Sequence, residues 1–376
     1  MNLYSRKKIF IIAGEASGDM HGAALAKALK QLNPRVELFG MGGEKMKQAG
    51  VCLFFESTKL AVTGFIEVLK HLNEFKKIFE LLRAKLSEVK PDAVILIDYP
   101  GFNLKFAPKV KELNIKLFYY ISPQVWAWGK NRVKIIRRLV DKMLVVFKFE
   151  EDFYKQAGVN AQFVGHPLLD IAAEYKAVPT EKKGIKIALL PGSRENEIKY
   201  ILPVMLKTSL LLQEKLKNAE FLLAASTTVK KETYQKIIEK HNVKNLRVLT
   251  DKFYDCLSAC DFALVCSGTA TLETALFQKP MAIIYKMSFL SYLIIRALIK
   301  IPFIGLVNIV SGKKIVPEFI QTGARPKAIA DYALKILSNP SAKKQIEENL
   351  SEVRKKLGTP CASRRAAEVI LGEMGK

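Results

Sequence analysis

The chain has 376 residues, of which 49% are hydrophobic and 26% are charged, a balance typical of a globular protein long enough for two domains. Its 60 Lys and Arg residues outnumber 36 Asp and Glu residues, and the formal net charge of +24 indicates an anionic partner: a nucleic acid, an acidic membrane surface or a phosphorylated substrate. The basic residues are dispersed and form no known nucleic-acid-binding signature, so we expect no nucleic-acid partner.

The cysteines and histidines argue against a metal site. The five Cys residues form no CxxC pair, which is typical of unpaired thiols in a reducing cytoplasm, and the four His residues are scattered. We therefore expect no metal and no cofactor. The apolar run near the N-terminus is short and ends in Gly14 and Glu15, which predicts a first strand and not a signal peptide. No stretch reaches the ~18 uncharged apolar residues of a membrane span.

The first strand is predicted at residues 8–13, before a glycine-rich turn at 14–19 and a helix. The glycines of this turn do not form GxGxxG, so a dinucleotide fingerprint is absent. Glu15 and Asp19 either cap the helix or contact a substrate, and the sequence leaves both roles open.

Short apolar strands then recur with helical spacers between them. This alternation predicts an α/β fold with doubly wound parallel sheets. Ligands of such sheets bind outside the carboxyl ends of the strands, a rule that selects Glu15, Asp98, Ser122 and His166. The further strands predicted in this half are 37–40, 93–98, 116–121, 142–147 and 162–165.

Asp98 ends an apolar strand just before a Pro100-Gly101 turn. A carboxylate held there can act as a general base, or it can simply cap the turn. His166 either contacts the substrate or orders the turn between domains. Both tryptophans lie in the segment 122–129, followed by a basic run, which favours a membrane-facing or substrate-facing loop over one that stacks on bases.

Two segments have the composition of membrane-contacting elements. Residues 64–83 predict an amphipathic helix, and residues 287–310 are apolar apart from Arg296 and Lys300. Each can equally pack into a protein core. With the strong positive charge, the two segments favour peripheral attachment to an anionic membrane.

A polar segment at 174–183 predicts a linker between an N-terminal domain, 1–173, and a C-terminal domain, 184–355. We expect the last stretch, 356–376, to form a helix that packs back on the first domain. The strands predicted in the second domain are 185–190, 221–225, 246–249, a strand beginning at 262, and 281–285.

The strand that begins at residue 262 ends in Ser-Gly and opens a helix. The unpartnered backbone N–H groups of Gly268, Thr269, Ala270 and Thr271 at the positive end of that helix form a ready place for a phosphate. Glu273, one turn further, can accept hydrogen bonds from ribose hydroxyls or merely offset the helix dipole.

A second turn of this kind follows the strand 185–190. Ser193 there can serve as an N-cap. The positively charged Arg194 lies at the positive end of a helix dipole. This placement makes best sense if an anion neutralises both the guanidinium and the helix end. The two turns together predict a diphosphate site at the carboxyl edge of a parallel sheet.

These motifs together resemble the lipid A disaccharide synthases, the membrane-associated glycosyltransferases of lipopolysaccharide assembly in Gram-negative bacteria. The matching segments follow one another along nearly the whole chain. They are GEASGD (14–19), IDYPGFN (97–103), SPQVWAWG (122–129), GHP (165–167), LLPGSR (189–194), SGTATLE (267–273) and LVNIVSGKKIVPEFIQ (306–321).

The resemblance implies a glycosyltransferase B-type fold, in which two Rossmann-like domains face a cleft, with the acceptor on the first domain and the UDP-sugar on the second. It also implies the reaction. The 2,3-diacylglucosamine unit of UDP-2,3-diacylglucosamine passes to 2,3-diacylglucosamine 1-phosphate, and the products are the β(1→6)-linked disaccharide and UDP. The transfer inverts the anomeric carbon and needs no metal.

The resemblance also implies roles for single residues. Asp98 matches the base that takes the proton of the acceptor 6-hydroxyl, and Asn308 matches a polar residue important for activity. Glu15 and Ser17 fall in the matching glycine-rich turn and are assigned, with His166 and Asn308, to substrate binding.

On the UDP side, Arg194 matches a diphosphate contact. Ser193 and the turn 268–271 would hold the leaving diphosphate with it, and Glu273 would hold the ribose. The enzyme would lie in the cytoplasm, peripherally on the anionic inner face of the cytoplasmic membrane. A homodimer, with or without exchange of C-terminal helices, stays open.

Three alternatives compete with this interpretation. Another UDP-sugar enzyme of the same fold, such as a UDP-GlcNAc 2-epimerase or a muropeptide-type glucosaminyltransferase, would share the nucleotide turns. A non-catalytic, peripheral lipid-binding protein would use Asp98 only as a turn cap. A nucleic-acid-binding protein would explain the charge but not the two phosphate turns.

Overall fold

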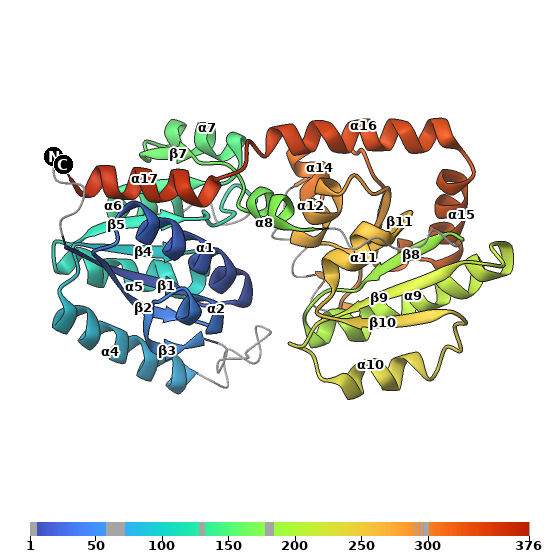
Figure 1. The fold of residues 1–376 in the computed structure, drawn as a ribbon, viewed down its shortest axis with the longest axis horizontal. Helices are drawn as coiled ribbons and strands as arrows, with labels where there is room; N and C mark the ends of the chain where they lie inside the picture. Colours follow the sequence, from blue (N-terminus) through green and yellow to red (C-terminus); the bar gives the residue numbers. More distant parts are fainter. Residues whose placement is uncertain are drawn as a thin grey trace. The chain divides into compact units, whose positions relative to one another are not determined.

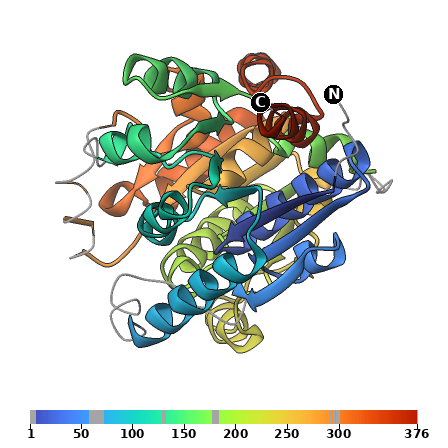
Figure 2. The ribbon, with the colours of Figure 1, turned by 90° about the vertical axis from the view of Figure 1, so that its left-hand side faces the viewer.

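The computed structural model describes residues 6–57, 72–127, 132–176, 184–289, 292–293, 296 and 301–375. The chain forms two compact units, Met1–Asp170 with Leu357–Lys376, and Ile171–Lys356. Each unit has its own parallel sheet with helices on both faces, as the fold class predicted (Figures 1 and 2). None of the described helices is long and apolar enough to cross a membrane.

The first unit is built on a seven-stranded parallel sheet. The sequence predicted all of these strands except β3, a short edge strand whose side chains are mostly half-exposed. The strands are β1 (Lys7–Ala13), β2 (Val36–Gly42), β3 (Cys52–Glu56), β4 (Ala93–Ile97), β5 (Lys116–Tyr120), β6 (Lys142–Val145) and β7 (Ala161–Phe163).

Their order in the sheet is β3-β2-β1-β4-β5-β6-β7. β1 pairs with β4, and their last residues, Ala13 and Ile97, lie opposite each other. β4 pairs with β5 up to Tyr120. Because all strands are parallel, the turns that follow β1, β4 and β5 meet at one edge of the sheet.

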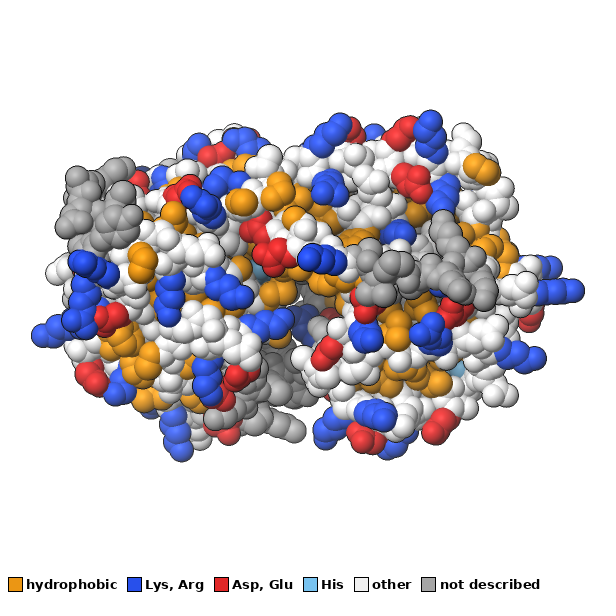
Figure 3. Space-filling view, in the orientation of Figure 1, with side chains coloured by type: hydrophobic (Ala, Val, Ile, Leu, Met, Phe, Trp, Pro, Cys, Tyr) orange, Lys and Arg blue, Asp and Glu red, His pale blue; other side chains and the backbone are white. Residues whose placement is uncertain are grey.

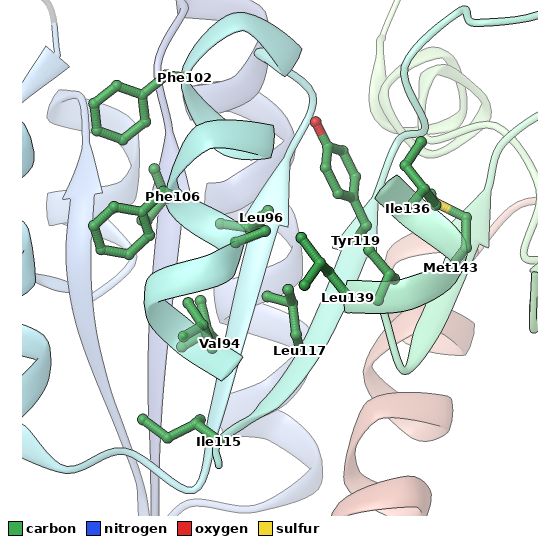
Figure 4. Packing of buried hydrophobic residues seen from close by; sticks show 14 of the residues in the cluster. Val94, Leu96, Phe102, Phe106, Ile115, Leu117, Tyr119, Ile136, Leu139 and Met143 are labelled. Atoms are coloured by element: carbon green, nitrogen blue, oxygen red, sulfur yellow. The ribbon is translucent and has the colours of Figure 1, made fainter. Parts of the chain in front are cut away.

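Helices cover both faces of this sheet. The helices α4, α5 and α6 bury their apolar side chains on one face, whereas α1 and α17 pack together over the other (Figures 1 and 4). Leu96 and Phe106 in this core are fully buried, and burial of such a side chain contributes about 1.5–3 kcal/mol. The helices are α1 (Ala16–Leu32), α2 (Glu44–Gln48), α4 (Leu72–Val89), α5 (Pro100–Glu112), α6 (Arg132–Leu139), α7 (Lys148–Gln156) and α17 (Ala362–Met374), while α8 (Leu168–Glu174) begins in this unit and ends in the second.

The last helix of the chain, α17, belongs to the first unit, where it lies on α1 (Figures 1 and 2). The Asp170 carboxylate accepts hydrogen bonds from the N–H groups of Cys361, Ala362 and Ser363, the latter two at 3.1 Å. Arg365 binds backbone carbonyl oxygens beside them. Asp170 therefore caps a helix that begins 192 positions later in the sequence.

The described part of the predicted membrane helix, 64–83, packs on its own sheet. Residues 58–71 lie outside the described ranges. From Leu72 onward the segment forms α4, whose Ile78 and Leu82 are buried in the core of the first unit. The alternative in which this face packs into the protein is thus the correct one for these residues.

The second unit has a six-stranded parallel sheet, in which the strands lie side by side in the order β10-β9-β8-β11-β12-β13. β8 pairs with β11, and Leu190 lies opposite Val265 near their carboxyl ends. The last strand, β13, has only three residues and was not predicted from the sequence. The strands are β8 (Lys186–Leu190), β9 (Glu220–Ala225), β10 (Leu246–Thr250), β11 (Phe262–Cys266), β12 (Met281–Tyr285) and β13 (Glu318–Ile320).

The apolar segment 287–310 is not one continuous helix, since residues 301–305 are not helical and a separate short helix begins at Leu306. Val307 of that helix is buried, whereas Phe289 and Leu293 are 69% and 47% exposed. Residues 290–291, 294–295 and 297–300 lie outside the described ranges. The predicted linker, 174–183, begins at the end of α8, and residues 177–183 lie outside the described ranges. The helices of this unit are α9 (Glu195–Lys215), α10 (Lys231–Ile238), α11 (Phe253–Ala259), α12 (Thr269–Leu276), α14 (Leu306–Ser311), η2 (Gln321–Gly323), α15 (Pro326–Leu337) and α16 (Pro340–Lys356).

Candidate functional site

Asp98 lies half-buried directly after β4, in a backbone conformation that is uncommon for residues other than glycine. Its φ is 45°, and Tyr99, the N-cap of α5, follows with φ 46°. Two consecutive left-handed residues that are not glycine cost about 1–3 kcal/mol each and persist only where the surroundings hold them. The same conformation ends β4 at Ile97, one residue before the predicted end.

Tyr99 joins the turn after β4 to the turn after β1. Its ring lies where the Cβ of any other residue at position 14 would be, with Tyr99 Cδ1 only 2.1 Å from that point, so Gly14 has to be a glycine. Burial, and then the neighbouring Glu15 carboxylate, raises the pKa of Tyr99 to about 12. The structure therefore brings the predicted residues Glu15 and Asp98 to one edge, on turns that contact each other.

Glu15 is exposed at the N-cap position of α1 and makes no side-chain capping bond, while Ser17 is half-buried in the first turn. Asp19 does not cap α1 either. Its buried carboxylate accepts hydrogen bonds from the N–H groups of Gly43 at 2.7 Å and Met46 at 3.0 Å, and so caps α2. The prediction that Asp19 caps α1 or contacts a substrate is wrong, because its oxygens are used inside the unit.

His166 is buried, with 6% of its surface exposed. Its Nδ1 accepts a hydrogen bond from the Leu168 N–H at 3.2 Å, and its ring lies 5.2 Å from that of Phe147. Burial, and then the charge of His21, lowers the pKa of His166 to about 3, so the imidazole is neutral at pH 7. This geometry supports the alternative in which His166 orders its turn.

Ser122 and Trp126 follow β5 at the same edge. Ser122 is buried, and the half-buried Trp126 indole donates from Nε1 to Glu150 Oε1 at 3.0 Å. Glu150 is 1% exposed, and burial raises its pKa to about 7. A buried carboxyl that ionises only near neutral pH thus holds the indole, an arrangement that the sequence did not reveal. Trp128 lies outside the described residues.

In the second unit, α12 begins where the sequence predicted a phosphate turn. Its N-cap, Gly268, has φ 148° and no atom within 4 Å of the place where a Cβ would be, so the surroundings of the helix end are open. Thr269 is exposed and Ala270 half-buried. The Thr271 hydroxyl and the Thr271 N–H both donate back to the Gly268 carbonyl, at 2.8 Å and 3.1 Å, so the N–H groups that this turn offers to an anion are those of Gly268, Thr269 and Ala270.

Glu273 lies one turn further, where Tyr254 donates a 2.6 Å hydrogen bond to its Oε1. Burial raises the pKa of Glu273, and the bond from Tyr254 opposes that change. The Tyr254 ring stacks on Phe277 at 5.6 Å, which fixes the donor. The Glu273 carboxyl is therefore held in one orientation, in which it can accept hydrogen bonds from the hydroxyl groups of a ligand.

The turn after β8 does not need the external anion that the sequence predicted for Arg194. Glu197 Oε2 accepts hydrogen bonds from the N–H groups of Ser193 at 2.9 Å and Arg194 at 3.3 Å, and its Oε1 lies 3.4 Å from the Arg194 guanidinium. Arg194 thus has an anion from its own helix, so its position does not require an external one. Its side chain is nevertheless 53% exposed.

Asn308, in α14, has no hydrogen-bonding group left for a ligand within the described structure. It is fully buried, and its Nδ2 donates to the Val316 carbonyl and to Glu318 Oε1, both at 2.9 Å. Its Oδ1 accepts from the N–H groups of Ile315 and Val316. In this structure the amide fastens α14 to the loop before β13, and direct substrate binding by Asn308 stays a prediction.

Among the described residues no three His, Cys, Asp or Glu side chains gather as metal ligands would. The structure brings Glu15, Ser17 and Asp98 to the carboxyl edge of the first sheet. In the second unit it brings the turn 268–271 beside Ser193 and Arg194, because β8 and β11 are neighbours.

Solved structures with the same fold share little sequence with this chain. A UDP co-structure of S. aureus MnaA has a TM-score of 0.70 at 14% identity and covers 98% of this chain and 97% of its own. CalG4, the calicheamicin glycosyltransferase, has a TM-score of 0.65 at 11% identity and covers 99% of both chains. These likenesses establish the glycosyltransferase B-type fold.

Sequence comparison is more specific. A family model described as lipid-A-disaccharide synthetase matches residues 9–371. A relative from Syntrophus aciditrophicus (strain SB), named lipid-A-disaccharide synthase, is 46% identical over 372 residues, which cover 97% of each chain. The chain therefore belongs to the lipid-A-disaccharide synthetase family.

Proposed function

We propose that this chain transfers 2,3-diacylglucosamine from UDP-2,3-diacylglucosamine to the 6-hydroxyl of 2,3-diacylglucosamine 1-phosphate, as a glycosyltransferase of lipid A biosynthesis. The family match over residues 9–371 carries this proposal. The products are the β(1→6)-linked disaccharide 1-phosphate and UDP. The geometry of the two sheet edges supports a division of labour between the units, with the acceptor on the first and the nucleotide on the second.

Asp98 acts as the general base. Its carboxylate takes the proton of the acceptor hydroxyl while the oxygen attacks the anomeric carbon, and the bond from that carbon to the diphosphate breaks with its electron pair on UDP. A single displacement of this kind inverts the anomeric centre. The half-buried position of Asp98, beside the exposed Glu15, supports this role because it leaves the edge of the sheet open to a sugar.

The leaving diphosphate is stabilised by preorganised donors and needs no metal. The N–H groups of the turn 268–271 and the Arg194 guanidinium supply them, and Glu273 binds the ribose. Because Glu197 already occupies the N–H groups of Ser193 and Arg194, the diphosphate has to displace it or bind beside it. The Arg194 side chain is 53% exposed, which supports a contact between its guanidinium and a phosphate.

The acyl chains of both substrates lie in a membrane, and the protein attaches to the anionic inner face of the cytoplasmic membrane from the cytoplasm. The exposed Phe289 and Leu293 support this, as does the net charge of +24. Lys and Arg side chains are scattered over the face seen in Figure 3, which suits diffuse attraction to a charged surface. A homodimer stays a prediction that sedimentation equilibrium can check.

Cosedimentation with vesicles tests the membrane contact. Vesicles with anionic lipid should retain the wild-type protein, and the Phe289→Ser, Leu293→Ser double variant should bind them several-fold less tightly at unchanged folding. Equal binding of the two proteins would remove this segment from the contact.

The reaction itself is tested by UDP release from UDP-2,3-diacylglucosamine in detergent, with and without acceptor and with EDTA. We expect release that requires the acceptor and survives EDTA. Release without acceptor, or conversion of the donor to an epimer, would favour an epimerase, an activity that solved structures with the same fold have.

A further inference from the structure

The carbonyl oxygen of Asp98 receives two side-chain hydrogen bonds from inside the first unit. Asn103 Nδ2, in the first turns of α5, donates to it at 2.7 Å and also to the Ile97 carbonyl at 3.1 Å. The Tyr119 hydroxyl, from the neighbouring strand β5, donates to it at 2.6 Å. Two elements thus hold the single residue at which β4 turns into the left-handed conformation.

Both donors are fully buried. Among the described residues, Asn103 Oδ1 makes no hydrogen bond, so the amide interacts there only through the two hydrogen bonds that Nδ2 donates. Burial, and then the Asp98 charge, raises the pKa of Tyr119 well above its usual value, and the hydroxyl stays a donor. Figure 4 shows the Tyr119 ring on the face that α5 covers, near Leu96 and Leu117.

These bonds have a consequence for the carboxylate. In a continued strand, the side chain at position 98 would follow the alternation and point to one face of the sheet. The left-handed turn redirects the side chain, and it holds only while the carbonyl is fixed. The Tyr99 ring, wedged on Gly14, fixes the next residue in the same way.

We propose that Asn103 and Tyr119 are positioning residues for glycosyl transfer: by fixing the Asp98 carbonyl they aim the Asp98 carboxylate at the acceptor hydroxyl. The inference rests on the proposed role of Asp98 as the base. A plain stabilising role for the two side chains is the competing explanation. It predicts a loss of stability in their variants without a selective loss of turnover.

The two explanations separate in the kinetics of Asn103→Ala and Tyr119→Phe, the second of which keeps the core volume. We expect kcat to fall about 100-fold in Asn103→Ala and about 10-fold in Tyr119→Phe, with KM for both substrates changed less than about threefold. The matched control is Asn33→Ala. Asn33 is also buried, and its Oδ1 accepts from the Arg35 N–H, but it follows α1 at the opposite edge of the sheet.

Double variants with Asp98→Ala complete the test. If Asn103 acts through Asp98, Asn103→Ala should lower the residual kcat of Asp98→Ala by less than about twofold. An equal loss in both backgrounds, or a loss of kcat in Asn33→Ala as large as in Asn103→Ala, would overturn the positioning role. A wild-type kcat in Asp98→Ala would instead overturn the base assignment, so the two failures are distinct.

Discussion

Replacement of Glu150 by Gln should make the first unit more stable at alkaline pH. Burial raises the pKa of the Glu150 carboxyl from 4.5 to about 7, with the hydrogen bond from Trp126 opposing the change. The folded protein therefore binds this proton more tightly than the unfolded chain does. The stability that the carboxyl contributes is fully present below about pH 4.5 and is lost as the pH rises through about 7.

The magnitude follows from the change in pKa. At about 1.4 kcal/mol per pKa unit, a rise from 4.5 to about 7 corresponds to about 3 kcal/mol of unfolding free energy. Gln keeps an oxygen for the Trp126 N–H but does not titrate. The difference in unfolding free energy between Glu150→Gln and wild type should therefore increase by about 3 kcal/mol from about pH 4.5 to about pH 8.5.

Urea unfolding followed by tryptophan fluorescence measures this difference in the right unit. Trp126 and Trp128 are the only tryptophans of the chain, and both belong to the first unit. Glu151 is the matched control on the same helix. Burial would raise its pKa, but hydrogen bonds from Lys148 and Lys155 outweigh this and lower it to about 2.

Glu151→Gln should accordingly change stability in the opposite sense: wild type gains over the variant as the pH rises through the range where the unfolded carboxyl ionises. A pH-independent difference for Glu150→Gln would refute the buried neutral carboxyl.

Three further changes have defined outcomes. Asp170→Ala should remove the cap of α17, lower the unfolding free energy of the first unit by about 2 kcal/mol and reduce amide-exchange protection in that helix; unchanged protection would contradict the capping role. Arg194→Ala should weaken UDP binding about 10-fold by calorimetry, and less at high salt, whereas an unchanged affinity would exclude it from the diphosphate site. Glu273→Ala should weaken binding of UDP about 10-fold and of 2′-deoxy-UDP much less, and an equal loss for both would reject the ribose contact.

The sequence predicted the elements whose pattern is local. β4 and β11 are continuous apolar runs, and the residues after them, Asp98 and Gly268, were placed at the carboxyl edges by the general rule for parallel sheets. The short edge strands β3 and β13 were missed, because three to five half-exposed residues carry no clear period.

The sequence failed where a residue's partner is distant along the chain or where two functions share one pattern. Asn308 was marked by the resemblance alone, and no local pattern predicts that its amide bonds to the Val316 carbonyl and Glu318. Arg194 seemed to need an external anion, although Glu197, three positions on, supplies the charge. A Glu three positions after the N-cap residue is a common capping signal, and it predicts the contact of Glu197 with the N–H groups of this turn. No sequence pattern predicts that Asp170 caps α17.

The most direct test of the account is turnover by Asp98→Ala under acceptor saturation, with UDP affinity measured on the same preparation. We predict that kcat falls by about 100-fold or more while UDP binds within about threefold of wild type, because the proposed base and the proposed nucleotide turns belong to different units. A variant that releases UDP at the wild-type rate in an acceptor-dependent way would contradict the assignment of Asp98 as the base.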